Sequence, residues 1–535
     1  MVSPSISFPI GADQTFLVPE GNFAAQGNQK IASDFADKIP SIAFSLPDLE
    51  AQATLVLKAK DGGESVACIK SVVGNGKTLE VPAVSYVAAG VAGAALILTG
   101  LSALGSAGQA GAATSSPTFG EVLGWLQSLA TNGMLSVNYP SIYRSFTKNF
   151  AFSTGLIPWN QMQASIDNFR NMTGGNLTNN NVEFLRNATL IYSDGSNSTV
   201  KRSLAFVLDH VYLSARNIST SVNGTGSDGK NASGNAVNHF VSGIQGYAEQ
   251  LSIPQSNTFM TVLMIFAIVV AAIVVGILLF KVILEAWTLC GSFPAKLTNF
   301  RKDYWGLMAR TITNLILILY GVWTLYCIFQ FTHGDSWAAK LLAGLTLVIF
   351  TAILGYFTFR IWTLARQYKK TEGDVLALYQ NKETWRKYSL FYDSYKKGYW
   401  WLFVPTIVYM FARGCVIAGG DGSGMAQTIG QLAVETIMLI LLLWTRPFET
   451  KSGQWINISI QTVRVLSVAC ILVFVQQLGI SQTTKTVTGI VLIAVQSTLT
   501  GLLAILIAIN GIIVCFRENP HRRRRKENGR FFTFC

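Results

Sequence analysis

Charged residues are scarce in this chain. Only 13% of its 535 residues are Asp, Glu, Lys or Arg, whereas soluble proteins carry about twice that fraction. Half of the residues are hydrophobic, and the mean hydropathy is +0.38. The composition excludes an ordinary soluble globular protein, and most of the chain is predicted to lie in lipid.

Catalytic and metal-binding patterns are scarce as well. The four histidines are scattered along the chain and none pairs with cysteine at a metal-binding spacing: His210, His239, His333 and His521. No Walker-type or dinucleotide glycine motif precedes a predicted helix. We therefore expect no enzyme, no cofactor and no metal site.

The net charge of +13 does not indicate a nucleic-acid partner. The basic residues are spread over the connectors between apolar runs, and this distribution is the one that orients helices in a membrane. No nucleic-acid partner is expected.

Apolar runs of roughly 20 residues, the length that crosses a bilayer, occur about nine times. They lie near residues 83–104, 117–137, 258–284, 307–331, 338–363, 400–418, 425–445, 455–478 and 486–516. The runs predict a polytopic α-helical membrane protein, with two helices in residues 83–137 and a second membrane domain in residues 258–516.

The polar segment between the second and third runs is rich in Asn-x-Ser/Thr acceptors. Seven occur there: Asn171, Asn176, Asn187, Asn197, Asn217, Asn223 and Asn231. Such a density is typical of a segment in the secretory lumen or outside the cell, so residues 138–257 are predicted to be a glycosylated lumenal domain. Asn457 also begins an acceptor, but it lies at the mouth of an apolar run on the predicted cytosolic side and is interpreted as a chance match.

The charges of the connectors agree with this orientation. Alternation places the N-terminus in the lumen and the C-terminus in the cytosol, in a secretory-pathway membrane (endoplasmic reticulum, Golgi or vacuole), the plasma membrane or both. Among Lys and Arg residues, the short lumenal connectors hold only Lys485, whereas the predicted cytosolic connectors hold many, as orientation in a membrane requires. Cytosolic basic residues include Lys296, Arg301, Lys302, Arg366, Lys369, Lys370, Lys382, Arg386, Lys387, Lys396, Lys397, Arg446 and Lys451, and residues 522–526 in the tail 517–535.

The cytosolic linker 364–399 mixes these basic residues with many aromatic ones. An ordinary connector with snorkelling anchors is the favoured interpretation. The alternative is a phosphoinositide-sensitive segment lying along the anionic leaflet. The basic run 522–526 is likewise interpreted as a topogenic anchor.

Residues 1–80 have the pattern of a lumenal β domain. Residues 49–59 alternate apolar and polar side chains, a turn follows at 61–64, and residues 65–70 return as a partner strand. Cys68 is the one cysteine on the predicted lumenal side, so we expect its disulfide partner outside this chain, together with a signal segment and the first half of the domain.

Several segments resemble the fungal TRP-like family. Residues 39–50 (IPSIAFSLPDLE), 65–70 (SVACIK) and 75–78 (NGKT) resemble the second half of its ML-like lipid-recognition domain. Residues 131–153 (TNGMLSVNYPSIYRSFTKNFAFS) resemble its signature after the second span, and residues 446–448 (RPF) and 475–480 (VQQLGI) resemble its last spans. The resemblance covers nearly the whole chain, and it implies a lumenal β-sandwich with an apolar cavity for a sterol or phospholipid.

The family comprises flavin carrier proteins and polycystin-like proteins regarded as calcium-permeable channels. The resemblance therefore implies transport and leaves the transported species open. We expect a calcium-permeable cation channel. The alternatives are a carrier of flavin (FAD) or another solute, and a lipid-binding or scrambling protein that uses the lumenal domain.

The connector between the sixth and seventh runs departs from a standard TRP channel. Residues 419–424 are too short for a selectivity filter with a re-entrant pore helix. Without that element the usual reason for a four-fold axis is absent, so a symmetric dimer is preferred among homo-oligomers. Asp421 in this turn is interpreted as a solvated turn residue rather than a member of an acidic ring.

Three ionisable residues fall deep inside predicted spans. Along ideal helices, Glu435 lies about 15 Å and Arg413 about 9 Å below the lumenal face, and Arg464 about 14 Å above the cytosolic face. Charges at such depth are expected to pair, here Glu435 with Arg464 at the same level. The cluster is either a polar transport pathway or gate, or an ion-pair lock that fixes helix register.

The acceptor cluster generates a test of topology. Deglycosylation is expected to lower the apparent mass of the protein, and replacing the seven asparagines from Asn171 to Asn231 together should abolish that shift. Asn457→Gln alone should leave the shift unchanged. Labelling of a Ser394→Cys variant by an impermeant thiol reagent added outside intact cells would contradict the orientation.

Overall fold

The computed structural model describes residues 26–27, 47–48, 50–58, 65–74, 77–105, 116–192, 197–199, 220–221, 237–290 and 304–516. The chain divides into a small unit, residues 1–45 and 201–235, and a large unit, residues 46–200 and 236–535. In the small unit, strand β1 (Gln26–Gly27) pairs with β6 (Thr220–Ser221) in antiparallel fashion. Several residues singled out in the sequence lie outside the described ranges: Asn217, Asn223, Asn231, Lys296, Arg301, Lys302 and residues 522–526.

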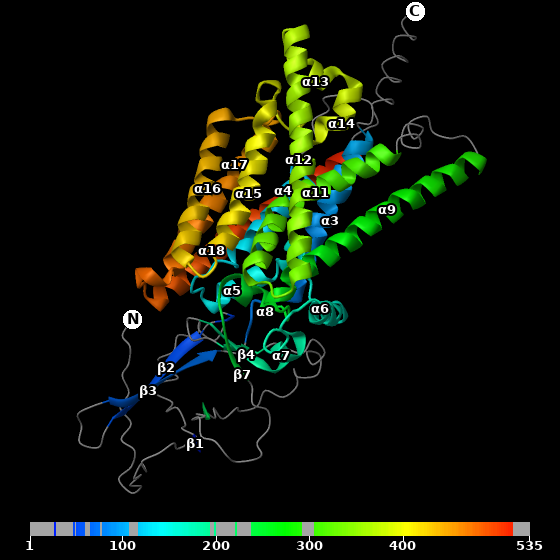
Figure 1. The fold of residues 1–535 in the computed structure, drawn as a ribbon. Coiled ribbons are helices and arrows are strands. Elements are labelled where there is room, and N and C mark those ends of the chain that lie inside the picture. Colours follow the sequence, from blue (N-terminus) through cyan, green and yellow to red (C-terminus); the bar gives the residue numbers. More distant parts are fainter. Residues whose placement is uncertain are drawn as a thin grey trace, which may run out of the picture. The chain divides into compact units, whose positions relative to one another are not determined.

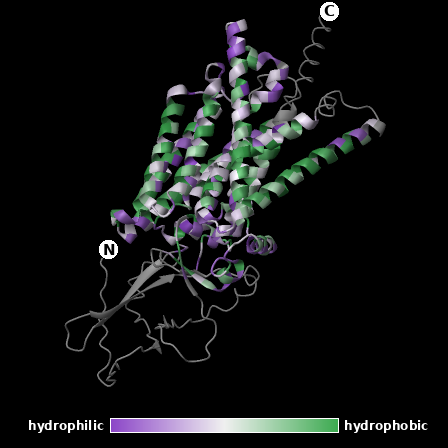
Figure 2. Ribbon diagram, in the orientation of Figure 1, coloured by the Kyte–Doolittle hydropathy of each residue, from purple (hydrophilic) through white to green (hydrophobic). Residues whose placement is uncertain are grey.

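The large unit is built from long apolar helices (Figure 1). In the described part of the chain, eight helices have the length and composition to cross a membrane. They are α3 (Pro82–Gly105), α9 (Thr258–Cys290), α11 (Tyr304–His333), α12 (Trp337–Thr371), α15 (Phe403–Gly419), α16 (Gly424–Thr445), α17 (Lys451–Ile471) and α18 (Gln482–Phe516). Most of their residues are hydrophobic (Figure 2), and each helix coincides with a predicted run, which supports a polytopic membrane protein.

The second predicted run, 117–137, differs from the others. Helix α4 (Phe119–Asn132) has 14 residues, about 21 Å at the usual helical rise, which is short of a hydrocarbon core of about 30 Å. A capping box between Thr118 and Glu121 fixes its start, and Trp125 and Leu129 are buried. Within the described residues the structure therefore has eight lipid-length helices rather than the predicted number of about nine, because α4 is apolar for packing against protein.

The described residues between α4 and α9 form short helices and strands rather than long helices. The helices are α5 (Ser141–Lys148), α6 (Asn160–Met172), α7 (Val182–Asn187) and α8 (Gly243–Glu249), and the strands are β4 (Ala188–Tyr192), β5 (Asn197–Thr199) and β7 (Val237–Val241). Strand β4 is central, antiparallel to β5 and parallel to β7. The acceptors Asn171, Asn176 and Asn187 are all exposed, as attachment of a glycan requires.

The predicted N-terminal hairpin is confirmed. Strand β2 (Glu50–Lys58) pairs with β3 (Ser65–Gly74) in antiparallel register, with Val56 opposite Cys68. The β-sandwich and the external disulfide partner of Cys68 stay predictions.

The linker 364–399 folds onto the helices. It contains the end of α12, then α13 (Ala377–Gln380), α14 (Lys382–Tyr392) and the start of η3 (Lys397–Leu402). Tyr379, Phe391 and Tyr392 are buried, and the hydroxyls of the two tyrosines donate to backbone carbonyls. These aromatic residues are core residues rather than the membrane anchors predicted from the sequence.

A buried arginine joins the short elements to the long helices. Arg170 of α6 is fully buried, and its Nε donates to Asp335 Oδ1 at 3.0 Å in the α11–α12 connector. A second nitrogen of the guanidinium donates to the other oxygen of Asp335, and Nη1 donates to Asn257 Oδ1 at 2.7 Å and to Asp167 Oδ1 at 3.2 Å. Bidentate pairing of this kind holds two planar groups in one orientation.

Arg170→Ala should destabilise the protein strongly. Removing one partner from a buried ion pair costs about 3–5 kcal/mol, because the remaining carboxylates lose their counter-charge. The expected result is a lower melting temperature of the purified protein in detergent. Arg186→Ala is the matched control, since Arg186 is exposed on the neighbouring helix α7; equal melting temperatures for the two variants would contradict a structural role for Arg170.

Candidate functional site

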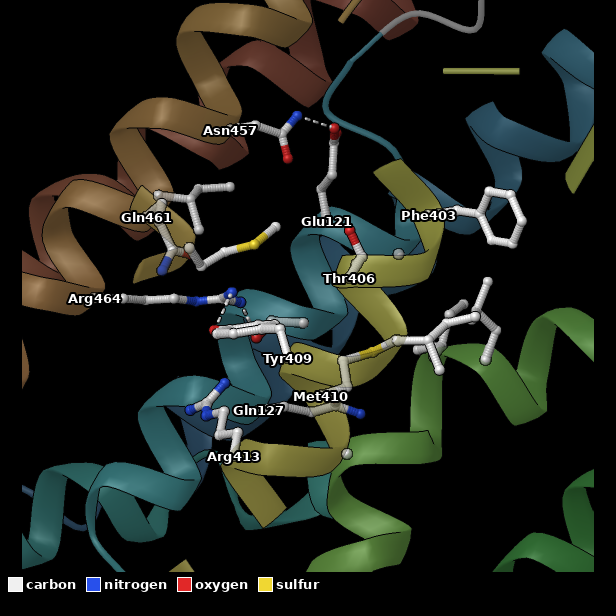
Figure 3. A pocket seen from close by; sticks show the side chains of 18 of the residues that line it. Glu121, Gln127, Phe403, Thr406, Tyr409, Met410, Arg413, Asn457, Gln461 and Arg464 are labelled. Atoms are coloured by element: carbon white, nitrogen blue, oxygen red, sulfur yellow. Dashed lines mark hydrogen bonds between the residues drawn. The ribbon is translucent and has the colours of Figure 1, made fainter. Parts of the chain in front are cut away.

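A cavity of about 320 Å³ lies among five helices of the large unit (Figure 3). Helices α4, α11, α15, α16 and α17 supply most of its lining. The segment from α14 to the start of α15 contributes further residues, as do Thr118 before α4 and Phe448 between α16 and α17. The cavity lies within a single chain. Its lining includes polar side chains of the membrane helices, among them Arg413, Gln461 and Arg464.

Glu435 of α16 is the buried anion beside this cavity, with 1% of its surface exposed. Its Oε1 accepts a hydrogen bond from Gln431 Nε2 at 2.9 Å, and its Oε2 accepts from Tyr409 Oη and from Gln461 Nε2, each at 2.7 Å. Arg413 Nε lies 3.5 Å from Oε1 and forms the ion pair. Four partners on three helices satisfy the carboxylate, as burial of a charge requires.

Two arginines face the cavity near Glu435. Arg413 Nη2 donates to Thr131 Oγ1 of α4 at 2.6 Å. Arg464 Nη2 donates to the Gly124 carbonyl of the same helix at 2.6 Å, and its Nη1 donates to Tyr409 Oη at 3.4 Å. In Figure 3, Arg464, Tyr409 and Arg413 follow one another along the cavity wall.

The Nε atoms of both arginines are buried and have no hydrogen-bond acceptor within the described residues. A buried donor without an acceptor is costly, and such groups need an explanation. A water molecule or a bound group in the cavity would supply the missing acceptor.

The opposite end of the cavity carries a carboxylate. Glu121 Oε2 accepts from Ser116 Oγ and from the Thr118 backbone N–H, both at 2.7 Å, and Oε1 accepts from Asn457 Nδ2. Glu121 and Thr131 are ten residues apart on α4, about 15 Å along the helix. The cavity therefore has the Glu121 carboxylate at one end and the Arg413 guanidinium toward the other. Arg464 lies between them, because Gly124 is only three residues from Glu121 on α4.

The structure brings the three predicted charges together but pairs them differently. Within the described residues, Arg413 is the ion-pair partner of Glu435, and Arg464 reaches the carboxylate through Tyr409. The expected direct pair of Glu435 with Arg464 is therefore wrong. Depth along separate ideal helices gives the level of each residue but not its direction around the helix axis, which decides the partner.

Sequence reasoning missed the neutral members of the site. Tyr409 precedes Arg413 by four residues and Gln431 precedes Glu435 by four, so each pair shares a helix face, and this spacing could have identified them. Gln461 was expected to bond to a neighbouring helix, and it does so through Glu435. Thr131 and Gly124 carry no such pattern, because their role depends on the central position of α4.

Asp421, in the turn between α15 and α16, is not solvated as predicted. Its side chain is 9% exposed, Ser136 Oγ donates to its Oδ1 at 2.8 Å, and His333 Nε2 lies 3.7 Å from Oδ2. Burial raises the pKa of Asp421 above its ordinary value. The turn is short, as predicted, and its carboxylate ties the loop after α4 to the end of α11.

Charge exchange tests the observed pairing. Glu435→Gln leaves Arg413 without its anion at membrane depth, which should cost at least about 3 kcal/mol and lower the yield and the melting temperature in detergent. Exchanging the charges in Glu435→Arg with Arg413→Glu should recover part of the loss. The exchange of Glu435 with Arg464 is the matched control and should recover less; better recovery by this control would contradict the geometry.

Comparison with known proteins places the chain in a family. The model for the transient receptor potential (TRP) ion channel matches residues 84–533, and the model for the ML-like domain matches residues 12–79. Together the two matches cover the N-terminal hairpin, the short elements and all the long helices described above. No solved structure matches the chain.

Curated relatives are fungal. The TRP-like ion channel protein flc1 of Cryptococcus neoformans is 27% identical over 89% of this chain and 63% of its own length. Flavin carrier protein 2 of Saccharomyces cerevisiae is 25% identical over 94% of this chain and 64% of its own length. The TRP-like ion channel pkd2 of Schizosaccharomyces pombe is 22% identical over 94% of this chain and 68% of its own length. The chain thus spans somewhat less than two thirds of the first two relatives, and with the TRP model matching most of its residues it belongs to the transient receptor potential (TRP) ion channel family.

Proposed function

We propose that this chain is a TRP-like membrane transport protein and that its substrate passes through the cavity between α4, α11, α15, α16 and α17. The observation that carries the proposal is a charged cavity inside helices that are otherwise apolar. Ionisable groups at membrane depth commonly mark substrate or ion pathways. The names of relatives as TRP-like ion channels support the same function.

The first candidate is a cation channel, with calcium as the expected ion. Glu121 at one end of the cavity, with Asp393 and Glu449 in a small pocket beyond it, gives that end the negative charge that attracts cations. The ion pair of Arg413 with Glu435 cancels one positive charge. Arg464 is then the remaining cationic barrier, so a cation path requires the Arg464 guanidinium to stay turned toward Tyr409 and Gly124.

The second candidate is a carrier of an anionic solute. The excess of positive charge around Arg413 and Arg464 favours it. Arg413 and Arg464 face the cavity near the single carboxylate of Glu435, and their Nε donors have no hydrogen-bond acceptor among the residues that the structure describes. Guanidinium groups bind phosphate and carboxylate oxygens well. Relatives are named flavin carriers, and FAD carries a pyrophosphate of this chemistry.

We also propose the domain arrangement, the membrane and the oligomeric state of the protein. Residues 138–257 form a glycosylated lumenal domain, residues 1–80 form the C-terminal half of an ML-like β domain that binds a sterol or phospholipid, and the tail 517–535 is cytosolic. The protein resides in a secretory-pathway or plasma membrane as a homodimer. A lipid-binding or scrambling activity of the lumenal domain is the third class of function.

Reconstitution separates the candidates. A channel is expected to give unitary currents in planar bilayers, and Arg464→Gln should increase cation preference because it removes the unpaired positive charge. A carrier is expected to give saturable uptake of labelled flavin into liposomes, and the same variant should lose it. Lys369→Gln, at an exposed position near the end of α12, is the control and should behave as wild type.

Unchanged currents and unchanged uptake after neutralising Glu435, Arg413 and Arg464 in well-folded protein would reduce the cluster to an ion-pair lock. Absence of both activities in the wild-type protein would reject the transport function of this chain.

A further inference from the structure

A thin partition separates the Glu121 end of the cavity from a smaller pocket. Four residues line both the large cavity and the small pocket beyond it: Thr118, Glu121, Ser394 and Phe448. The two spaces are therefore neighbours separated by single side chains. The small pocket is polar, and Asp393 and Glu449 contribute carboxylates to it.

The partition is held by contact between two connectors. Tyr395, between α14 and η3, forms an isolated antiparallel bridge with Phe448, between α16 and α17, and the two rings lie 5.4 Å apart. The Lys396 N–H donates to the Pro447 carbonyl at 2.6 Å, and the Glu449 N–H donates to the Ser394 carbonyl at 3.3 Å. A single bridge, unlike a sheet, needs only a few hydrogen bonds to break before the connectors separate.

The backbone beside the bridge is strained. Arg446 has φ of +42° and ends helix α16 in the left-handed conformation, which is unfavourable for a residue with a side chain. Its carbonyl accepts a hydrogen bond from Lys396 Nζ at 2.7 Å, so the other connector holds the strained residue in place. Strain of this kind concentrates at switch regions, where one of two arrangements is held by specific contacts.

Tyr395 also connects the partition to the cavity wall. Its hydroxyl lies 3.4 Å from Thr406 Oγ1 on α15, and both residues line the cavity. Thr406 lies one turn before Tyr409 and Met410 on the same helix, so a rotation of α15 moves Tyr395 and the Arg464 contact together.

We propose that the contact between Tyr395 and Phe448 is a gate that closes this end of the cavity. Separation of residues 394–396 from residues 446–449 joins the cavity to the acidic pocket, and contact between them seals it. The role of the gate in transport rests on the proposed function, whereas its control of access to the cavity does not. An ordinary packing contact would leave access unchanged when it is locked or removed.

A reversible cross-link tests the gate. Residues opposite each other in an antiparallel bridge have Cα atoms close enough for a disulfide, so the double variant Tyr395→Cys with Phe448→Cys can be locked by oxidation. Transport in liposomes or bilayers should be lost on oxidation and recovered on reduction. The antiparallel pair Gln52 and Val72 in β2 and β3, changed to cysteines in the same way, is the matched control and should keep its transport.

Access is measured separately from transport. Met410→Cys places a thiol in the cavity lining. The rate at which a water-soluble thiol reagent labels this thiol is measured in two proteins. One carries Met410→Cys alone, and the other also carries Tyr395→Ala and Phe448→Ala. Removing both rings should accelerate labelling severalfold. If labelling becomes faster but the protein transports nothing, the gate is supported and the transport function is rejected. Unchanged labelling would overturn the gate. Unchanged transport in the fully cross-linked protein would overturn it as well.

Discussion

The arrangement of the helices depends on the burial of one carboxylate at membrane depth. An isolated charge in such a setting is very unfavourable, so Glu435 needs partners that come from several directions. Tyr409 and Arg413 come from α15, Gln461 from α17 and Gln431 from its own helix. Because each partner must arrive at a fixed distance, the carboxylate sets the rotation of three neighbouring helices at once.

Helix α4, which also lines the cavity, is held by the same group of side chains. The two arginines that neutralise or approach Glu435 also donate to Thr131 and to the Gly124 carbonyl of α4. An added Cβ at Gly124 would lie 3.6 Å from Arg464 Nη2, so this helix and the guanidinium meet at ordinary contact distance. Helix α4 is too short to cross lipid and is stabilised by these contacts with neighbouring helices. The same contacts satisfy the polar groups of Arg413 and Arg464 inside the membrane domain.

The long helices and the β2–β3 hairpin could be predicted from the sequence, because hydropathy and strand alternation are local properties. The same hydropathy misjudged α4, since a core helix and a lipid-facing helix are equally apolar. The levels of Glu435, Arg413 and Arg464 followed from counting residues, but the pairing of Glu435 with Arg413 depends on helix rotation. Asp421 was misjudged for a similar reason: its burial comes from Ser136 and His333, which are distant in sequence.

Helix α15 connects the three polar features along the cavity. Its N-terminal turns hold Thr406 against Tyr395, its middle carries Tyr409 and Arg413, and the turn after its last residue holds Asp421 against Ser136. Small residues let it approach α11 closely, since an added Cβ at Gly414 would lie 2.7 Å from the Gly321 carbonyl. Because α15 packs closely on α11 and is hydrogen bonded to Tyr395 and to Glu435, a displacement of the helix would have to change these contacts together. Under the proposed gate, opening at the Glu121 end of the cavity is therefore coupled to the contact between Arg464 and Tyr409.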